Sequence, residues 1–204
     1  MKAYLWFKQI LDYICSAALI VILSPILLLL AAAVKLDSKG PVLFRQKRIG
    51  KDHVEFNILK FRTMRADTPS DMPTHLFRDS ESFITSTGRF LRKSSLDELP
   101  QLFNILQGQM SFIGPRPALW NQYDLIRARE DQAAKTGISA NSVKPGITGW
   151  AQVNGRDELP IEVKADFDGF YAKNISFPLD LKILFMTVTS VLTSKGISEG
   201  GPRS

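Results

Sequence analysis

The sequence predicts a mostly helical α+β protein with a single membrane helix near its N-terminus, and three observations predict this class. An uncharged, almost wholly apolar segment of 22 residues runs from Tyr13 to Val34. Apolar residues then alternate loosely over residues 41–64, around an Ile49-Gly50 turn, which is typical of two short strands. Farther along the chain, apolar residues recur at helical spacing instead. A small β element inside a helical protein accounts for all three.

The apolar segment is long enough to cross a bilayer. At about 1.5 Å per residue, a straight helix of this length spans a hydrocarbon core of roughly 30 Å. Ser24-Pro25 lies at its midpoint, where the proline removes a backbone donor and clashes with the carbonyl of Val21, so a kink is expected. The Ser24 hydroxyl can satisfy the group that the proline frees. A secretory signal peptide fits poorly, because its apolar run is shorter and holds no central proline.

The orientation of this helix stays open on pattern alone. Lys2 and Lys8 precede the apolar segment and a denser basic cluster follows it, so the positive-inside rule gives no clean asymmetry. A kinked helix that spans the membrane is one solution. A re-entrant helix that enters, bends at Ser24-Pro25 and returns to the same leaflet is the other, and it leaves both ends on the cytoplasmic face.

The net charge of +6 is concentrated in one stretch of the chain. Residues 35–65 hold nine Lys and Arg residues against three Asp and Glu residues, which accounts for the whole excess. This placement, directly after the apolar segment, favours an anionic membrane surface or phosphate-bearing ligands. The aromatic residues form no recognisable nucleic-acid-binding motif with this cluster, so we expect no nucleic-acid partner. With one Cys and two His residues in the chain, carboxylates must supply any hard-metal site.

The rest of the chain predicts a loop at 65–82, helices at 96–110 and 119–135, and Gly-punctuated loop and strand at 143–156. The segment from Leu181 to Leu192 places its apolar residues on one helical face. Two interpretations remain for this last helix. It can pack in the core, or it can lie as an amphipathic helix in the membrane interface.

The acidic pair Asp97-Glu98 admits two interpretations as well. Ser95 and Glu98 match the S-x-x-E capping box, so both carboxylates can simply suit a helix start. Arg92 and Lys93 lie just upstream, however, and paired carboxylates beside cations are also typical of a Mg²⁺ and phosphate site. A carboxylate in such a site can attack phosphorus directly.

Other turns carry cations at their edges. Gly114-Pro115-Arg116-Pro117 displays one arginine between two prolines, which lowers the entropy that Arg116 loses on binding phosphate. Residues 144–149, which read Lys-Pro-Gly-Ile-Thr-Gly, and Asn154-Gly155-Arg156 form similar turns. Together these elements predict a site for a diphosphate.

Several blocks of the chain together resemble the bacterial sugar transferase family, and most closely its small monotopic phosphoglycosyl transferases. The blocks are residues 60–64 (KFRTM), 96–102 (LDELPQL), 110–117 (MSFIGPRP), 145–156 (PGITGWAQVNGR) and 171–180, which ends at Asp180. The resemblance implies a re-entrant membrane helix over residues 1–36 and a catalytic domain over residues 37–195, on the cytoplasmic face of the bacterial inner membrane. Residues 196–204 form a tail outside the resemblance.

The resemblance also implies an activity. Such enzymes transfer a sugar-1-phosphate from a UDP-sugar to undecaprenyl phosphate or another polyprenyl phosphate, release UMP, and need Mg²⁺. The family's acidic dyad matches Asp97, the nucleophile of a covalent phosphosugar intermediate, and Glu98, and the pair is expected to bind the metal. Substrate-binding residues are expected within the matching blocks and just upstream of the dyad: Lys60, Arg62, Arg92, Arg116, Arg156 and Asp180.

Two alternatives accompany this prediction. Larger members that use UDP-glucose or UDP-galactose often carry extra membrane helices, which favours an N-acetylated amino sugar for this chain over a hexose. A catalytically silent membrane scaffold is the other alternative, against which the intact Asp97, Glu98, Arg92 and Arg116 set argues. Self-association through the membrane helix or the C-terminal face is compatible with the sequence.

Overall fold

The computed structural model describes residues 2–68, 80–155 and 159–192, and every structural statement here concerns those residues. Helices surround two small sheets, which confirms the mostly helical α+β class. The α-helices are α1 (Lys2–Asp37), α2 (Ser86–Ser94), α3 (Gln101–Leu106), α4 (Tyr123–Thr136), α5 (Trp150–Val153), α6 (Ile161–Asn174) and α7 (Phe177–Leu192). The strands are β1 (Leu43–Ile49), β2 (Glu55–Phe61), β3 (Ser111–Ile113) and β4 (Gly146–Thr148). Short 3-10 helices are η1 (Lys51–His53), η3 (Ser80–Phe83), η4 (Leu96–Glu98) and η5 (Ala140–Ser142).

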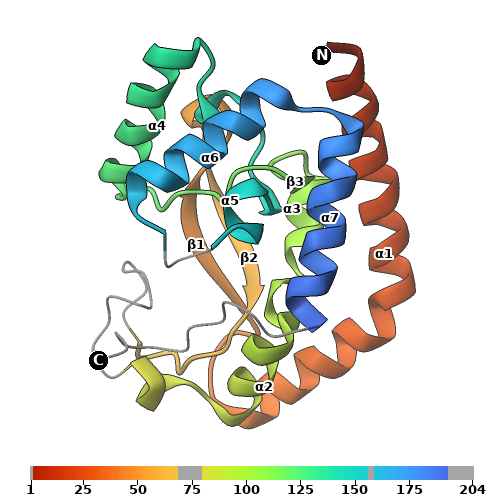
Figure 1. Ribbon diagram of the computed structural model, residues 1–204. Coiled ribbons are helices and arrows are strands. Elements are labelled where there is room, and N and C mark those ends of the chain that lie inside the picture. The colour runs from red at the N-terminus through yellow and green to blue at the C-terminus, as the bar shows by residue number, and fades with distance from the viewer. Residues whose placement is uncertain (1, 69–79, 156–158, 193–204) are drawn as a thin grey trace.

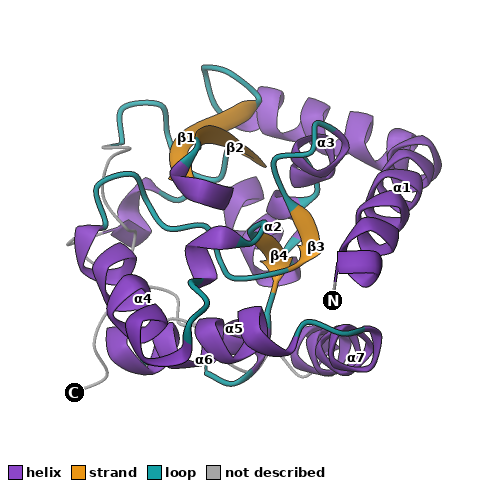
Figure 2. Cartoon of the chain, turned by 90° about the horizontal axis from the view of Figure 1, so that it is seen from above, coloured by secondary structure: helices purple, strands orange, loops and turns teal. Residues whose placement is uncertain are grey.

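The N-terminal helix α1 is 36 residues long and continues through Pro25. Its direction changes along its length, so that it wraps one side of the molecule (Figures 1 and 2). The Ser24 hydroxyl donates to the carbonyl of Val21 at 2.8 Å, which is the acceptor that the missing N–H of Pro25 would otherwise engage. Helix α1 is therefore continuous at Ser24-Pro25, where the sequence predicts a kink.

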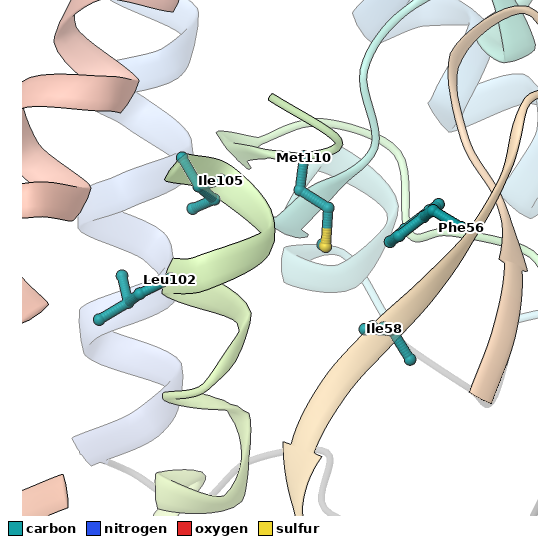
Figure 3. Packing of buried hydrophobic residues seen from close by; sticks show 5 residues of the cluster. All are labelled: Phe56, Ile58, Leu102, Ile105 and Met110. Carbon is teal, nitrogen blue, oxygen red and sulfur yellow. The ribbon is translucent and has the colours of Figure 1, made fainter. Parts of the chain in front are cut away.

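One face of α1 packs along the rest of the protein. Leu19, Ile20 and Leu23 lie against a cluster of buried residues from β2, α3 and the turn before β3, shown in Figure 3: Phe56, Ile58, Leu102, Ile105 and Met110. The opposite face of α1 is exposed: Val21 and Ile22 are 72% and 69% exposed. Within the described residues, α1 is the one helix long and apolar enough to cross a membrane.

The two predicted strands are confirmed as an antiparallel hairpin, β1–β2, in which Leu43 pairs with Phe61 and Ile49 with Glu55. A second sheet, which the sequence did not predict as a pair, joins β3 to β4 in parallel. Its register places Ile113 opposite Thr148. This pairing matters for function, because it brings the Gly-Pro-Arg-Pro and Pro-Gly-Ile-Thr-Gly segments side by side.

Two helix predictions need correction. The continuous helix expected over residues 96–110 is instead the 3-10 helix η4 followed by the six-residue α3, which ends where Gly108 takes φ +77°. The apolar spacing that predicted it holds only in part: Leu102 and Met110 are buried, but Phe103 and Leu106 are exposed and Ile105 is buried instead. Residues 150–153, expected as loop or strand, form the short helix α5.

The last helix, α7, does not pack as a core helix on the face predicted from its apolar pattern. Leu181, Leu184, Phe185 and Val188 are all exposed, whereas Ile183 on the other side is fully buried. Helix α7 lies beside the first half of α1 (Figure 1), and a carboxylate at its start, Asp180, bonds to that half. The exposed apolar side chains of α7 and α1 favour contact with lipid over packing within this chain.

Candidate active site

The acidic pair lies at a sharp junction between α2 and α3. Helix α2 ends at Ser95, which adopts a left-handed conformation with φ 56°, and η4 begins immediately after it. The Ser95 side chain makes no capping hydrogen bond. The capping-box interpretation is therefore wrong, because Ser95 has a left-handed backbone and its side chain caps no helix. Asp97 and Glu98 lie in this 3-10 turn.

Lys60 and Arg116 both approach the Glu98 carboxylate. The Lys60 ammonium, near the end of β2, lies 2.6 Å from Glu98 Oε1 and donates a hydrogen bond to it. The Arg116 guanidinium lies 3.7 Å from the same oxygen. Lys60, Glu98 and Arg116 come from three separate blocks of the sequence, so the fold assembles this part of the predicted site.

The Asp97 carboxylate has a different environment. Among the described residues, no group donates a hydrogen bond to it, although Lys60, Arg92 and Arg116 are close enough to act on its charge. Burial raises the pKa of Asp97 above its ordinary value, Lys60 opposes that rise, and the neighbouring Glu98 charge adds to it. Asp97 thus accepts no hydrogen bond from the described residues and is surrounded by positive charge, which suits a nucleophile or a metal ligand.

Arg92 is held in place by a residue that the sequence analysis did not single out. Its Nε donates to the Thr63 hydroxyl at 2.9 Å, and Thr63 is buried. The backbone carbonyl of Thr63 accepts from Thr85 N, the N-cap residue of α2. Gly88 packs on that same carbonyl, so a side chain at position 88 would collide with it. Thr63 lies inside the KFRTM block, but only the tertiary contact reveals its role.

The Gly-Pro-Arg-Pro segment leaves β3 in close contact with β4. Gly114 N donates to Thr148 O at 2.8 Å, and Gly146 N donates to Pro115 O at 2.9 Å. A Cβ on Gly114 would collide with the carbonyl of Lys144, and one on Gly149 would collide with the carbonyl of Gly114. The glycines of both motifs are needed for this approach, which sets the path of the backbone at Arg116.

Two other predicted substrate-binding residues, Arg62 and Asp180, do not join this group. Arg62 is buried, and its guanidinium donates to the carbonyls of Ser38 and Lys39 just beyond α1, at 2.7 and 2.9 Å. Asp180 is also buried and accepts from Tyr4, Lys8 and Tyr171. These contacts favour structural roles for Arg62 and Asp180. Arg156 lies outside the described residues.

The carboxylates at the site form a pair. Within residues 2–68, 80–155 and 159–192, no group of three or more His, Cys, Asp or Glu side chains could hold a metal by itself. Mg²⁺ usually binds through one or two carboxylates together with substrate phosphates, so the adjacent oxygens of Asp97 and Glu98 fit this ion without a third protein ligand.

A family model described as bacterial sugar transferase matches residues 3–194. The chain belongs to this family. The matched range runs from the start of α1 to beyond the end of α7 and includes Asp97, Glu98, Lys60 and Arg116. The family assignment thus agrees with the resemblance that the sequence blocks carry.

The relatives of this chain differ in length and in the sugar that their names specify. A protein named uncharacterized sugar transferase EpsL, from Bacillus subtilis, is 44% identical over 192 residues, covering 94% of this chain and 90% of the relative. A UDP-glucose:undecaprenyl-phosphate glucose-1-phosphate transferase from Klebsiella pneumoniae is 42% identical, covering 89% of this chain and 39% of the relative. A UDP-N-acetylgalactosamine-undecaprenyl-phosphate N-acetylgalactosaminephosphotransferase from Aeromonas hydrophila is 37% identical, covering 95% and 45%. The chain spans less than half the length of these last two.

Proposed function

We propose that this protein transfers a sugar-1-phosphate from a UDP-sugar to undecaprenyl phosphate or another polyprenyl phosphate and releases UMP. The observation that carries the proposal is the convergence of Lys60, Arg92 and Arg116 around the Asp97-Glu98 pair. Cations in excess of carboxylates suit a diphosphate substrate, and the names of the Klebsiella and Aeromonas relatives specify this class of reaction.

The proposed mechanism has two displacements at one phosphorus atom. The Asp97 carboxylate attacks the phosphorus that bears the sugar, and the bond to the UMP oxygen breaks. A phosphate oxygen of the polyprenyl acceptor then attacks the same phosphorus, and the bond to Asp97 breaks. Two anionic substrates would repel each other if they were held together, and this order separates them in time. The absence of hydrogen-bond donors on Asp97 among the described residues supports its assignment as the nucleophile.

The other residues of the site stabilise negative charge. Arg92, Arg116 and Lys60 are proposed to bind the phosphoryl oxygens, and Lys60 also holds Glu98 in place. Mg²⁺, held by Asp97 and Glu98, would neutralise charge on the diphosphate. Arg156 is proposed as a further substrate-binding residue on the resemblance alone.

The sugar is the part of the proposal that the relatives leave open. The preference for an N-acetylated amino sugar over a hexose depended on the extra membrane helices that larger, hexose-specific members often carry. The Aeromonas relative is also much longer than this chain, and its name specifies N-acetylgalactosamine. Length therefore does not separate the two donor classes, and the N-acetylated donor is proposed together with UDP-glucose as its direct competitor.

We propose that the protein acts at the cytoplasmic face of the bacterial inner membrane, with α1 re-entrant. Support comes from the bend of α1 and from its exposed apolar face. Single cysteines placed near both ends of α1, in a Cys15→Ser background, would test it with a membrane-impermeant maleimide in intact spheroplasts. Neither end should react if α1 is re-entrant. Labelling of one end would establish a spanning helix instead.

The deciding experiment measures UMP release from a panel of UDP-sugars by the protein in nanodiscs, with Mg²⁺ and undecaprenyl phosphate. Release from one donor would establish the reaction and name the sugar. A burst of UMP without acceptor, equal in amount to the enzyme and absent in Asp97→Asn, would support the covalent intermediate. No release across the panel from folded protein would favour the scaffold alternative.

A further inference from the structure

Four consecutive carbonyls, from Pro115 to Ala118, each accept a hydrogen bond from a different part of the fold. Pro115 O accepts from Gly146 N at 2.9 Å, and Ala118 O accepts from Ile49 N at 2.9 Å. The two carbonyls between them accept from side chains: Arg116 O from Arg129 Nη2 at 2.9 Å, and Pro117 O from Arg48 Nη1 at 3.0 Å. Backbone N–H groups of β4 and β1 thus bond to the two ends of this segment, and the side chains of Arg129 and Arg48 bond to its middle.

Prolines explain why side chains are needed there. Pro115 and Pro117 have no N–H, so the segment cannot continue the β3 ladder past Gly114 as a regular strand. The carbonyls of Arg116 and Pro117 need donors that reach in from other elements. A guanidinium supplies them well, because its fork can bind two partners at once.

The Arg129 guanidinium binds the Asp168 carboxylate and the Arg116 carbonyl at once. It is 3% exposed, and its Nε and Nη2 donate to Asp168 Oδ2 on α6 at 3.0 and 2.7 Å. The same Nη2 donates to Arg116 O, and Nη1 lies 3.4 Å from Asn141 Oδ1. Helices α4 and α6 could pack through apolar residues alone, so a buried ion pair is not required for their contact. The hydrogen bond from Arg129 to the Arg116 carbonyl gives this ion pair a role beyond the contact between the two helices.

We propose that Arg129, oriented by Asp168, is a positioning residue that fixes the backbone at Arg116 and so directs the Arg116 guanidinium toward the donor diphosphate. This inference rests on the proposed function, because it assigns Arg129 a part in that reaction. Arg48 supports the neighbouring carbonyl in the same way. The Arg116 side chain is partly exposed and long, with Glu98 at 3.7 Å, so its aim depends on a fixed backbone.

A double-mutant cycle tests whether Arg129 acts through Arg116. The values of kcat and KM for UMP release are compared for the wild type, Arg129→Lys, Arg116→Gln and the double variant. Lysine keeps the charge beside Asp168 but cannot bind Asp168 and the Arg116 carbonyl with one planar group. We expect Arg129→Lys to lower kcat/KM about 10- to 100-fold in the wild type, as for a small misplacement of a binding group. In the Arg116→Gln background the same change should have little effect.

Arg127→Gln is the matched control, because Arg127 is an exposed arginine on the same helix, and it should leave both parameters unchanged. Asp168→Asn keeps the side-chain shape and should show the same dependence on Arg116 as Arg129→Lys. Equal factors in both backgrounds would overturn the proposal, because a residue that only stabilises the fold acts whether or not Arg116 is present.

Hydrogen–deuterium exchange of the peptide spanning residues 111–122 provides a readout without activity. Arg129→Lys should speed exchange in this peptide relative to Arg127→Gln, and unchanged exchange would overturn the proposal. If the wild type releases no UMP from any donor, the proposed function fails, and the exchange result still decides whether Arg129 holds this segment.

Discussion

Two carboxylates of this protein, Asp97 and Asp180, were both predicted as site residues, and the structure separates them. Asp180 accepts hydrogen bonds from Tyr4 and Lys8 on α1 and from Tyr171 on α6, at 2.7, 2.7 and 2.8 Å. Asp97 accepts none from the described residues, although three cations, Lys60, Arg92 and Arg116, act on its charge. A carboxylate that accepts several hydrogen bonds from the protein stabilises the fold. One that accepts none from the described residues and lies beside positive charge can react with a ligand. The hydrogen bonds that each carboxylate accepts, more than its residue type, indicate whether its role is structural or catalytic.

Replacing the nucleophile should have the largest effect. Asp97→Asn keeps size and shape but removes the charge that attacks phosphorus, so UMP release should fall by at least about 10³-fold. Thermal stability should be unchanged or slightly higher, because the carboxylate accepts no hydrogen bond from the described residues. Activity assays and thermal unfolding in detergent check both parts. Substantial residual turnover would contradict the covalent role of Asp97.

The opposite pattern is expected for the second carboxylate. Asp180→Ala leaves Lys8, whose side chain is only 12% exposed, without its partner, which should lower the free energy of unfolding by about 3–5 kcal/mol. The kcat of the protein that remains folded should stay close to the wild-type value. Denaturation in detergent and active-site titration by the UMP burst separate the two quantities. A loss of kcat at full burst amplitude would return Asp180 to the catalytic site.

A smaller change tests the same network from the other side. Tyr171→Phe removes one donor to Asp180 and leaves the packing intact, so the free energy of unfolding should fall by about 1.5–3 kcal/mol. Both kcat and KM should be unaffected. The double variant Tyr171→Phe with Asp180→Ala should be destabilised by less than the sum of the two, because the residues share one network. Additive losses would mean that Tyr171 acts elsewhere.

The mildest expected effect is a shift of the pH profile. Asp97 reacts as the carboxylate, so activity falls as the pH drops through its pKa. Because burial raises that pKa, the fall should begin at a higher pH than for an ordinary aspartate. Lys60 lowers the pKa, so Lys60→Met should move the acid limb of the kcat/KM profile to still higher pH. Lys47→Met, at an exposed lysine on β1, is the control. An acid limb that stays in place would show that Lys60 does not act on Asp97.

Local pattern predicted much of the fold. The length and apolarity of α1, the alternation in β1 and β2, and the helical spacing in α4 and α7 depend on residues close in sequence. The failures occurred where tertiary contacts override local preference. Ser95 matches a capping box yet adopts a left-handed turn, and the apolar spacing through residue 110 continues across a helix that ends at Leu106.

For the site, the sequence by itself determined the family and the residues with the right chemistry: Asp97, Glu98, Lys60, Arg92 and Arg116. Only the tertiary structure decided which charged residues work together. It showed that Arg62 and Asp180 engage α1, that Thr63 holds Arg92, and that Arg129 reaches the Arg116 carbonyl. The physical reason is that hydrogen bonds between residues distant in sequence leave no periodic trace. Residue type alone cannot tell a carboxylate that is already satisfied from one that is ready to react.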